Sequence, residues 1–154
     1  MIDKQILIHA ILDELHRQFT RLCGAAEESR AGATDGENRS ESKYDTRSIE
    51  ANYLADGQSR QAEKVSLASA ALQVLQLRAF GPGDVAGLGA LVEVQMRDER
   101  MWFFLVPAAG GMEVTVDGNV ITLITPEAPL GRQLMGARTG VRTKSPASTV
   151  LQVA

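Results

Sequence analysis

The spacing of apolar residues changes near residue 81 of this 154-residue chain. Before that point, apolar residues recur every three or four positions, which is typical of paired amphipathic helices. After it, they form short runs that alternate with polar residues, which is typical of strands. The sequence therefore predicts an α+β fold. An N-terminal antiparallel coiled-coil hairpin is expected over residues 1–80, and a small antiparallel β domain with one short helix over residues 81–154.

Two heptad rows define the predicted hairpin. The first row comprises Ile8, Leu12, Leu15, Phe19, Leu22 and Ala26, and Ile11 widens it. Asp3 is the expected N-cap of this helix. The second row comprises Ala51, Leu54, Gln58, Gln61, Val65, Ala68, Leu72 and Leu75. We expect the second helix to continue through Gly57 and to end at Phe80-Gly81-Pro82-Gly83. Turn residues between positions 30 and 39 allow the rows to fold back on each other. Two helices of a compact bundle are the alternative.

Five strands and one helix are expected in the second half. The strand-like runs are 88–96, 101–106, 112–116, 120–125 and 149–153. Asp117-Gly118-Asn119 is a strong hairpin signal between two of them. Residues 126–136 have a helical pattern, with Leu130 and Leu134 four positions apart. Thr125 would be the N-cap of this helix and Pro126 its first residue.

Composition narrows the classes of protein that fit. The net charge of −3 argues against broad nucleic-acid binding, which needs a basic face. The lone Cys23 rules out an internal disulfide and fits a reducing compartment. There is no apolar stretch of about 20 residues and no signal-peptide layout, so we expect a cytoplasmic chain that does not enter a membrane.

Several short motifs resemble the bacterial GreA and GreB family of transcript-cleavage factors, which act in transcription elongation. In the helical half, the motif is Glu41-Ser-Lys-Tyr44 before a heptad helix that contains Gly57. In the second half, the motifs are Phe80-Gly81, Thr125-Pro126, Pro129-Leu130-Gly131-Arg132 and Leu134-Met135-Gly136. The resemblance covers most of the chain and is that of a divergent member of the family. It implies that the second domain is similar to the FK506-binding-protein fold.

The resemblance also implies a function. In that family the C-terminal domain docks at the rim of the RNA polymerase secondary channel, and the hairpin enters the channel. Acidic residues at the hairpin tip hold a second Mg²⁺ at the polymerase active site, which promotes hydrolysis of a backtracked transcript. Candidates for the tip are Asp35, Glu37, Glu41 and Asp45, and candidates for polymerase docking are Thr125, Pro126, Leu130 and Gly131.

On this interpretation the chain is not itself an enzyme. It has no cofactor or small-molecule substrate of its own, shares Mg²⁺ with RNA polymerase, and meets DNA and nascent RNA only within the polymerase complex.

Two segments depart from the family pattern. Val106-Pro-Ala-Ala-Gly-Gly111 replaces an acidic stretch, and Ala137-Arg-Thr-Gly-Val141 lacks a Gly-Asp pair.

Alternatives to transcript cleavage stay open. The chain could bind polymerase without stimulating cleavage, with Asp35 and Glu37 as ordinary solvated charges, or it could be a coiled-coil adaptor that dimerises. Thr125 and its neighbours could serve capping and packing alone. A prolyl isomerase is disfavoured because it needs an aromatic-lined pocket, whereas Trp102 and Phe103 alternate on one strand.

Two other groups of side chains do not predict a site. One heptad separates each of His9, His16 and Cys23 from the next, which is too far for ligands of one metal. The basic residues Arg138, Arg142 and Lys144 suit a solvated face.

Overall fold

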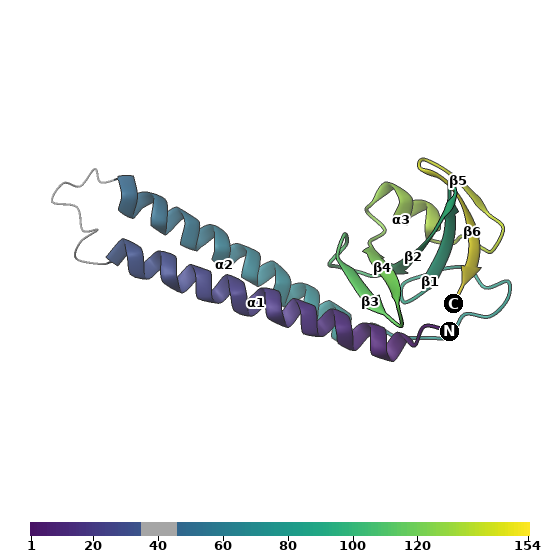
Figure 1. The fold of residues 1–154 in the computed structure, drawn as a ribbon, viewed down its shortest axis with the longest axis horizontal. Coiled ribbons are helices and arrows are strands. Elements are labelled where there is room, and N and C mark those ends of the chain that lie inside the picture. Colours follow the sequence, from purple (N-terminus) through teal and green to yellow (C-terminus); the bar gives the residue numbers. More distant parts are fainter. Residues whose placement is uncertain (35–45) are drawn as a thin grey trace. The chain divides into compact units, whose positions relative to one another are not determined.

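The computed structural model describes the backbone of residues 1–34 and 46–154, and their side chains except at 26, 29, 30, 32–34 and 46–53. Two long helices come first, α1 (Lys4–Thr34) and α2 (Thr46–Gln73). A six-stranded sheet follows, with the short helix α3 (Pro129–Leu134) between its fourth and fifth strands, as Figure 1 shows. This order confirms the α+β class and the helix-first arrangement predicted from the sequence.

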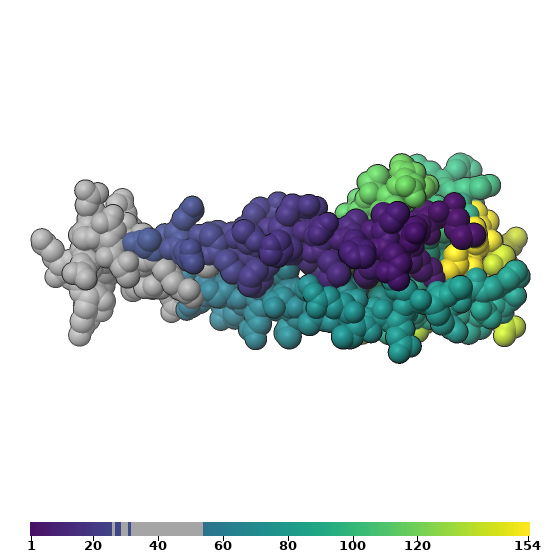
Figure 2. Space-filling view, turned by 90° about the horizontal axis from the view of Figure 1, so that it is seen from below, coloured from purple at the N-terminus to yellow at the C-terminus, as the bar shows by residue number. Residues whose placement is uncertain are grey.

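The chain divides into two compact units. One contains Met1–Leu12 and Ala70–Ala154, and we call it the sheet unit. The other contains Asp13–Ser69, and we call it the helical unit. Helices α1 and α2 lie side by side in both views (Figures 1 and 2). The first turns of α1 and the end of α2 thus belong to the same unit as the strands.

Helix α1 begins at an aspartate cap. The Oδ1 atom of Asp3 accepts hydrogen bonds from the backbone N–H groups of Gln5 (2.7 Å) and Ile6 (3.4 Å), which confirms the predicted N-cap. Phe19 is 36% exposed, so the predicted row weakens along the helix. The buried residues of α1 with described side chains are Leu7, Ile8, Ile11 and Leu15.

The buried row of α2 differs from the predicted one in its first half. Leu54 is 56% exposed and Gln61 is exposed, whereas the next residues, Ala55 and Ala62, are buried. The buried residues of α2 with described side chains are Ala55, Ala62, Val65, Ala68 and Leu72, and Gln58 and Ser69 beside them are half-buried. The sequence pattern favoured the larger Leu54, but alanine in the contact row lets two helices approach more closely.

Helix α2 ends at Gln73, not at Phe80 as predicted. The N–H group of Leu75 bonds to the carbonyl of Leu72 at 3.2 Å and closes the last turn. The chain then leaves the helix, and Phe80 is only 9% exposed in the core of the sheet unit. Gly89 has φ +81°, and a Cβ atom there would be 2.8 Å from the carbonyl oxygen of Gln76. The connector therefore passes directly against a glycine that no other residue could replace without a shift.

The sheet is mixed, which corrects the prediction of an antiparallel domain. Its order is β3-β4-β2-β1-β6-β5. Strands β2 and β4 pair in parallel, and every other neighbouring pair is antiparallel. The chain crosses from β2 to the edge strand β3, and the β3–β4 hairpin then returns β4 to the space beside β2. The strands are β1 (Leu91–Met96), β2 (Glu99–Leu105), β3 (Glu113–Val116), β4 (Asn119–Ile124), β5 (Arg142–Lys144) and β6 (Ala147–Val153).

Both faces of the sheet contain buried apolar residues. The face that packs on α3 includes Val92, Phe103 and Leu105 together with Leu130 and Leu134 of the helix. Residues on the opposite face alternate with these along each strand and are 0–1% exposed: Leu91, Phe104, Ile121 and Leu123. Figure 2 shows the N-terminal residues beside the C-terminal strand, where Ile2 and Gln152 line one hollow.

Helix α3 begins later than predicted. Pro129, not Pro126, is its first residue, and Ala128 is the N-cap without a side-chain cap bond. Thr125 instead begins a turn in which its carbonyl accepts the N–H of Ala128 at 3.1 Å. Leu130 and Leu134 are both buried, so the predicted pair at i and i+4 is confirmed.

Candidate functional site

The predicted acidic tip belongs to the segment between α1 and α2. Asp35, Glu37, Glu41 and Asp45 lie outside the described residues, which end at Thr34 and resume at Thr46. Their role as ligands of a shared Mg²⁺ stays a prediction from the sequence.

The four docking candidates lie where β4 ends and α3 begins. Thr125 and Pro126 are half-buried, so part of each side chain reaches the surface. Leu130 is only 7% exposed and packs in the core, and Gly131 is buried. The structure thus brings the four residues together, but only the first two present side chains to a partner in this conformation.

Two glycines close around Thr125. A Cβ atom on Gly131 would lie 2.0 Å from the carbonyl oxygen of Thr125, a distance that no side chain permits. A Cβ atom on Gly110 would lie 3.0 Å from Cγ2 of the same threonine. The start of α3 and the loop after β2 therefore fix Thr125 from both sides. Glycine at position 131 has a packing reason that the sequence motif alone did not reveal.

The loop of residues 107–111 is bonded to β4. The N–H of Val106 donates to the carbonyl of Ile124 at 3.0 Å, and the N–H of Gly111 donates to that of Leu123 at 2.8 Å. Ala109 between them has φ +62°, a conformation that is uncommon for a residue with a side chain. The exposed residues of this region are small or carry a single carboxylate: Pro107, Gly110, Gly111 and Glu127. With Thr125 and Pro126 they form what we call the loop surface.

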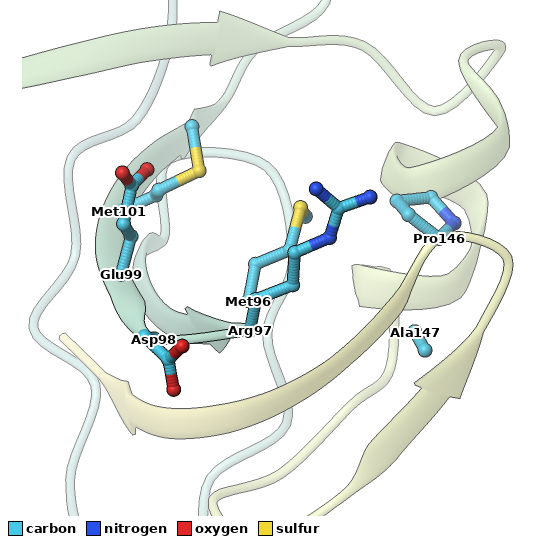
Figure 3. A pocket seen from close by; sticks show the side chains of 7 residues that line it. All are labelled: Met96, Arg97, Asp98, Glu99, Met101, Pro146 and Ala147. Atoms are coloured by element: carbon cyan, nitrogen blue, oxygen red, sulfur yellow. The ribbon is translucent and has the colours of Figure 1, made fainter.

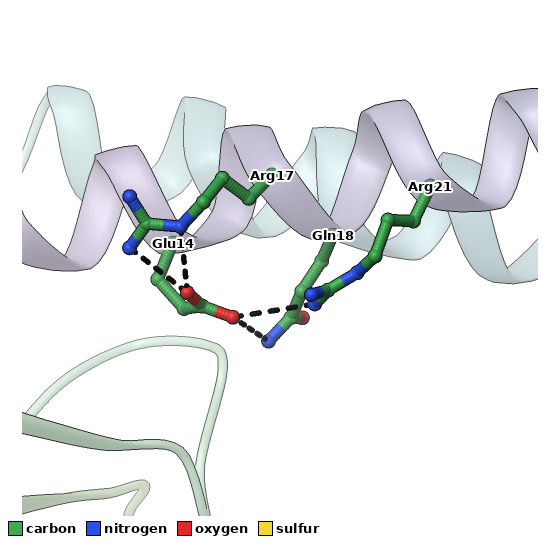
Figure 4. A network of polar contacts seen from close by, with 4 residues as sticks. All are labelled: Glu14, Arg17, Gln18 and Arg21. Carbon is green, nitrogen blue, oxygen red and sulfur yellow. Dashed lines mark hydrogen bonds and ion pairs between the residues drawn. The ribbon is translucent and has the colours of Figure 1, made fainter.

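A network of polar side chains lies on α1 in the helical unit. Glu14 accepts hydrogen bonds from Nε of Arg17 (3.0 Å) and Nε2 of Gln18 (3.2 Å), and pairs with Nη2 of Arg21 at 3.4 Å (Figure 4). The bond from Arg17, followed by that from Gln18, lowers the pKa of the Glu14 carboxyl. One carboxylate thus gathers two arginines along one side of the helix and leaves a local excess of positive charge.

The ends of two hairpins enclose a hollow of about 750 Å³ in the sheet unit. Met96, Met101 and Pro146 give it an apolar lining, and Figure 3 shows the side chain of Arg97 extended toward Pro146. The remaining lining residues are Asp98, Glu99 and Ala147. No aromatic residue lines it, which does not suit a prolyl isomerase.

Trp102 lines a different hollow, of about 370 Å³. Its neighbours there include the polar residues Asp117, Asn119 and Gln152. Phe103 and Phe104 are buried on opposite faces of the sheet. The aromatic residues of β2 therefore do not gather in one apolar pocket, and this confirms the prediction from the sequence.

No metal-binding group of three His, Cys, Asp or Glu side chains exists within the described parts of the chain, residues 1–34 and 46–154. His9 bonds through Nδ1 to the carbonyl of Gln5 within its own helix, at 2.6 Å. The basic residues Arg142 and Lys144 are exposed on the edge strand β5, with Thr143 buried between them. None of the described helices combines the length and the apolar character that crossing a membrane requires.

A cluster around Phe80 was missed by the sequence analysis. Lys4 and Arg78 both lie against the ring of Phe80, although 74 positions separate the two cations. No local spacing links residue 4 with residues 78 and 80, so only the tertiary structure reveals the cluster.

Among the comparisons with known proteins, the matches are to solved structures. No family model matches the sequence, and no curated protein matches it. A solved structure of the transcription factor Gfh1 has 21% identity and a TM-score of 0.37, over 95% of this chain and 92% of that one. The GreA factor homolog 1 (Gfh1) of Thermus thermophilus has 18% identity and a TM-score of 0.34, over 93% and 94% of the chains. Thermus aquaticus Gfh1 has 20% identity and a TM-score of 0.33, over 92% and 89%. The three alignments cover 92–95% of this chain.

Proposed function

We propose that this chain is a Gre-like transcription factor that binds RNA polymerase at its secondary channel and modulates elongation. One observation carries the proposal: two long paired helices precede a β-sheet domain, and in that domain α3 begins with the Pro-Leu-Gly-Arg motif. Helices α1 and α2 have 31 and 28 residues, about 45 Å and 40 Å at the rise of an α-helix. Each helix is thus longer than the roughly 30 Å diameter of a small domain.

The loop surface is the proposed docking site. Its small, proline-containing backbone is fixed by Gly131 and by the bonds to β4, so it is preorganised for a partner. Thr125 and Pro126 would touch the polymerase, while Leu130 and Gly131 hold the surface in shape. Glu127 supplies the one carboxylate of this surface and suits a basic partner residue.

The acidic segment is proposed to act at the polymerase active site. Asp35, Glu37, Glu41 and Asp45 supply four carboxylates within eleven residues, and carboxylate oxygen is what Mg²⁺ prefers. A metal ion held there would orient or activate water for hydrolysis of a backtracked transcript. The chain would act as a partner of the polymerase rather than as an enzyme.

Two measurements test the proposal in order. Purified full-length chain should co-purify with core RNA polymerase at low salt, and no retention would remove the proposal. Stalled, backtracked elongation complexes should then release cleaved transcripts faster with the chain and Mg²⁺ than with Mg²⁺ alone. Retention without faster cleavage would establish the alternative, a polymerase-binding factor that does not stimulate cleavage.

Matched variants separate the two surfaces. Converting the four acidic residues to their amides should abolish cleavage stimulation and leave polymerase binding intact. The control combines Glu27→Gln, Glu28→Gln, Asp56→Asn and Glu63→Gln, which removes four exposed carboxylates from α1 and α2 instead. If the control variant loses stimulation equally, the effect comes from net charge and not from metal ligation.

A coiled-coil adaptor is the second candidate. Helix α2 exposes Leu54 by 56% and Leu67 by 64%, which would suit contact with a second helical surface. Light scattering should then give twice the monomer mass, and Leu67→Lys should return it to the monomer. A monomeric wild-type chain would eliminate this candidate.

A further inference from the structure

Lys4, Arg78 and Phe80 form a compact cluster within the sheet unit. Nζ of Lys4 donates a hydrogen bond to the carbonyl oxygen of Arg78 at 2.7 Å and lies 4.6 Å from the centre of the Phe80 ring. Cζ of Arg78 lies 4.2 Å from the same centre. Phe80 itself is only 9% exposed, so the ring is a fixed support for both cations.

The cluster gathers two positive charges that have no acidic partner among the described residues. The ion pairs found there involve Glu14 and Glu93, not Lys4 or Arg78. The carboxylate nearest in sequence, Asp3, already accepts two backbone N–H groups as the cap of α1. Two unneutralised cations beside one ring create a local preference for an anionic ligand.

The amine of Lys4 is unusually easy to deprotonate. Burial, followed by the charge of Arg78, lowers the pKa of Lys4 from 10.5 to about 8. The ring and the carbonyl favour the charged amine, but they do not outweigh these two effects. Near pH 8 about half of the Lys4 amine is neutral, whereas roughly one ordinary lysine amine in 250 is neutral at that pH. A neutral amine is a nucleophile, and this one is still partly exposed to solvent.

We propose that Lys4 is an acylation site for acyl phosphates, with the guanidinium of Arg78 receiving the phosphate group. The neutral amine attacks the carbonyl carbon of the acyl phosphate and forms a C–N bond. The bond between the carbonyl carbon and the phosphate oxygen breaks. Inorganic phosphate leaves with the electron pair of that bond, and the proton lost by nitrogen passes to solvent. The reaction needs no oxidant, metal or further reactant, and it is independent of polymerase binding.

Acylation would alter the cluster without removing its frame. The amide formed keeps one N–H group that can donate to the carbonyl of Arg78. It has no charge, so repulsion from the guanidinium ends and the cation–ring contact of Lys4 is lost. The modification therefore changes the charge where α1 begins by one unit, while the Asp3 cap stays in place.

The direct test is the rate of acetylation at individual lysines. The full chain is incubated with acetyl phosphate at pH 8, and mass spectrometry measures occupancy at Lys4, Lys64 and Lys144, the last two being exposed. The larger neutral fraction, reduced by the weaker nucleophilicity of a less basic amine, gives Lys4 an expected advantage of about tenfold. A rate at Lys4 equal to or below the rates at the other two would overturn the proposal.

The role of Arg78 needs a second acyl donor. With Arg78→Gln, we expect the Lys4 rate with acetyl phosphate to fall about threefold more than the rate with the uncharged donor p-nitrophenyl acetate. Arg132→Gln, on the exposed side of α3, is the matched control and should change neither rate. An equal fall with both donors would show that Arg78 acts only on the amine and would contradict the phosphate contact. Circular dichroism on each variant verifies that the fold is retained.

Discussion

The two units of this chain bury very different side chains. All twelve of the largest fully buried side chains in the described parts of the protein lie in the sheet unit, Phe104 and Leu105 among them. Among its described side chains, the helical unit instead buries Leu15, Val65 and three alanines. Full burial of a large apolar side chain contributes about 1.5–3 kcal/mol, and an alanine methyl group contributes much less. The sheet unit therefore has a self-sufficient core, and the helical unit depends more on helix propensity and on its neighbours along the chain.

The largest expected effect comes from emptying the centre of the sheet unit. Phe104→Ala should reduce the free energy of unfolding by about 3–5 kcal/mol, because Phe104 is 0% exposed and the ring leaves a cavity. Leu15→Ala in the helical unit should cost about 2–3 kcal/mol, since this unit has fewer large buried side chains and the site can collapse more readily. Urea denaturation measures both.

Val120→Ala is the control, because Val120 is 55% exposed on the same sheet and should change stability by no more than about 0.5 kcal/mol. A loss for Leu15→Ala equal to that for Phe104→Ala would contradict the difference between the units.

Glycine-to-alanine substitutions should have opposite signs in the two units. Gly131→Ala places a methyl group 2.0 Å from the Thr125 carbonyl oxygen and should destabilise the sheet unit by about 2–4 kcal/mol. Gly57→Ala meets nothing within 4 Å inside α2 and should stabilise the helical unit by about 0.5–1 kcal/mol. Thermal unfolding monitored by circular dichroism distinguishes the two shifts. A stabilised Gly131→Ala protein would mean that the turn at Thr125 relaxes freely.

The same contrast explains what the sequence could predict. In the sheet unit, the alternating runs 88–96 and 112–116 predicted strands close to β1 and β3, because a half-buried strand has a simple two-residue period. In α2 the pattern predicted the helix but not its contact row, since Ala55 and Ala62 carry little hydrophobic signal beside Leu54. The strand β5 was missed because its three residues, Arg142–Lys144, include a single inward side chain.

The candidate site was predictable only in part. The motif around Thr125 and Gly131 identified the correct region, but the local sequence could not show that Gly131 is needed for a close backbone contact. The mixed sheet was also beyond local patterns, because parallel pairing of β2 with β4 depends on where the chain crosses after Leu105. The cluster of Lys4 with Phe80 depends on the same kind of long-range contact.

Hydrogen bonding should add a smaller, measurable contribution to the sheet unit. Oγ1 of Thr143 lies 2.7 Å from both the carbonyl of Pro146 and Oγ of Ser148, and it accepts the N–H of Ser148 at 3.0 Å. Thr143→Val keeps the shape but leaves the buried Ser148 groups without this partner, which should cost about 1–2 kcal/mol in urea denaturation. Thr115→Val, exposed on β3, is the matched control and should be neutral or slightly stabilising. A neutral Thr143→Val would show that water replaces the hydroxyl.

The smallest expected effect tests whether the first turn of α1 is energetically part of the sheet unit. The folded chain releases the Lys4 proton near pH 8, whereas the unfolded chain keeps it until about 10.5. Between these values the unfolded state binds more protons, so stability should rise with pH through this window and be lower, but constant, below it. Because the amine is about half exposed, the rise should stay below about 1 kcal/mol. Urea denaturation of wild-type and Lys4→Met proteins from pH 7 to 10.5 isolates the effect as a difference, with Lys64→Met as the control. If the wild-type and Lys4→Met curves run parallel, Lys4 titrates as an ordinary solvent-exposed lysine and the start of α1 is not coupled to Phe80.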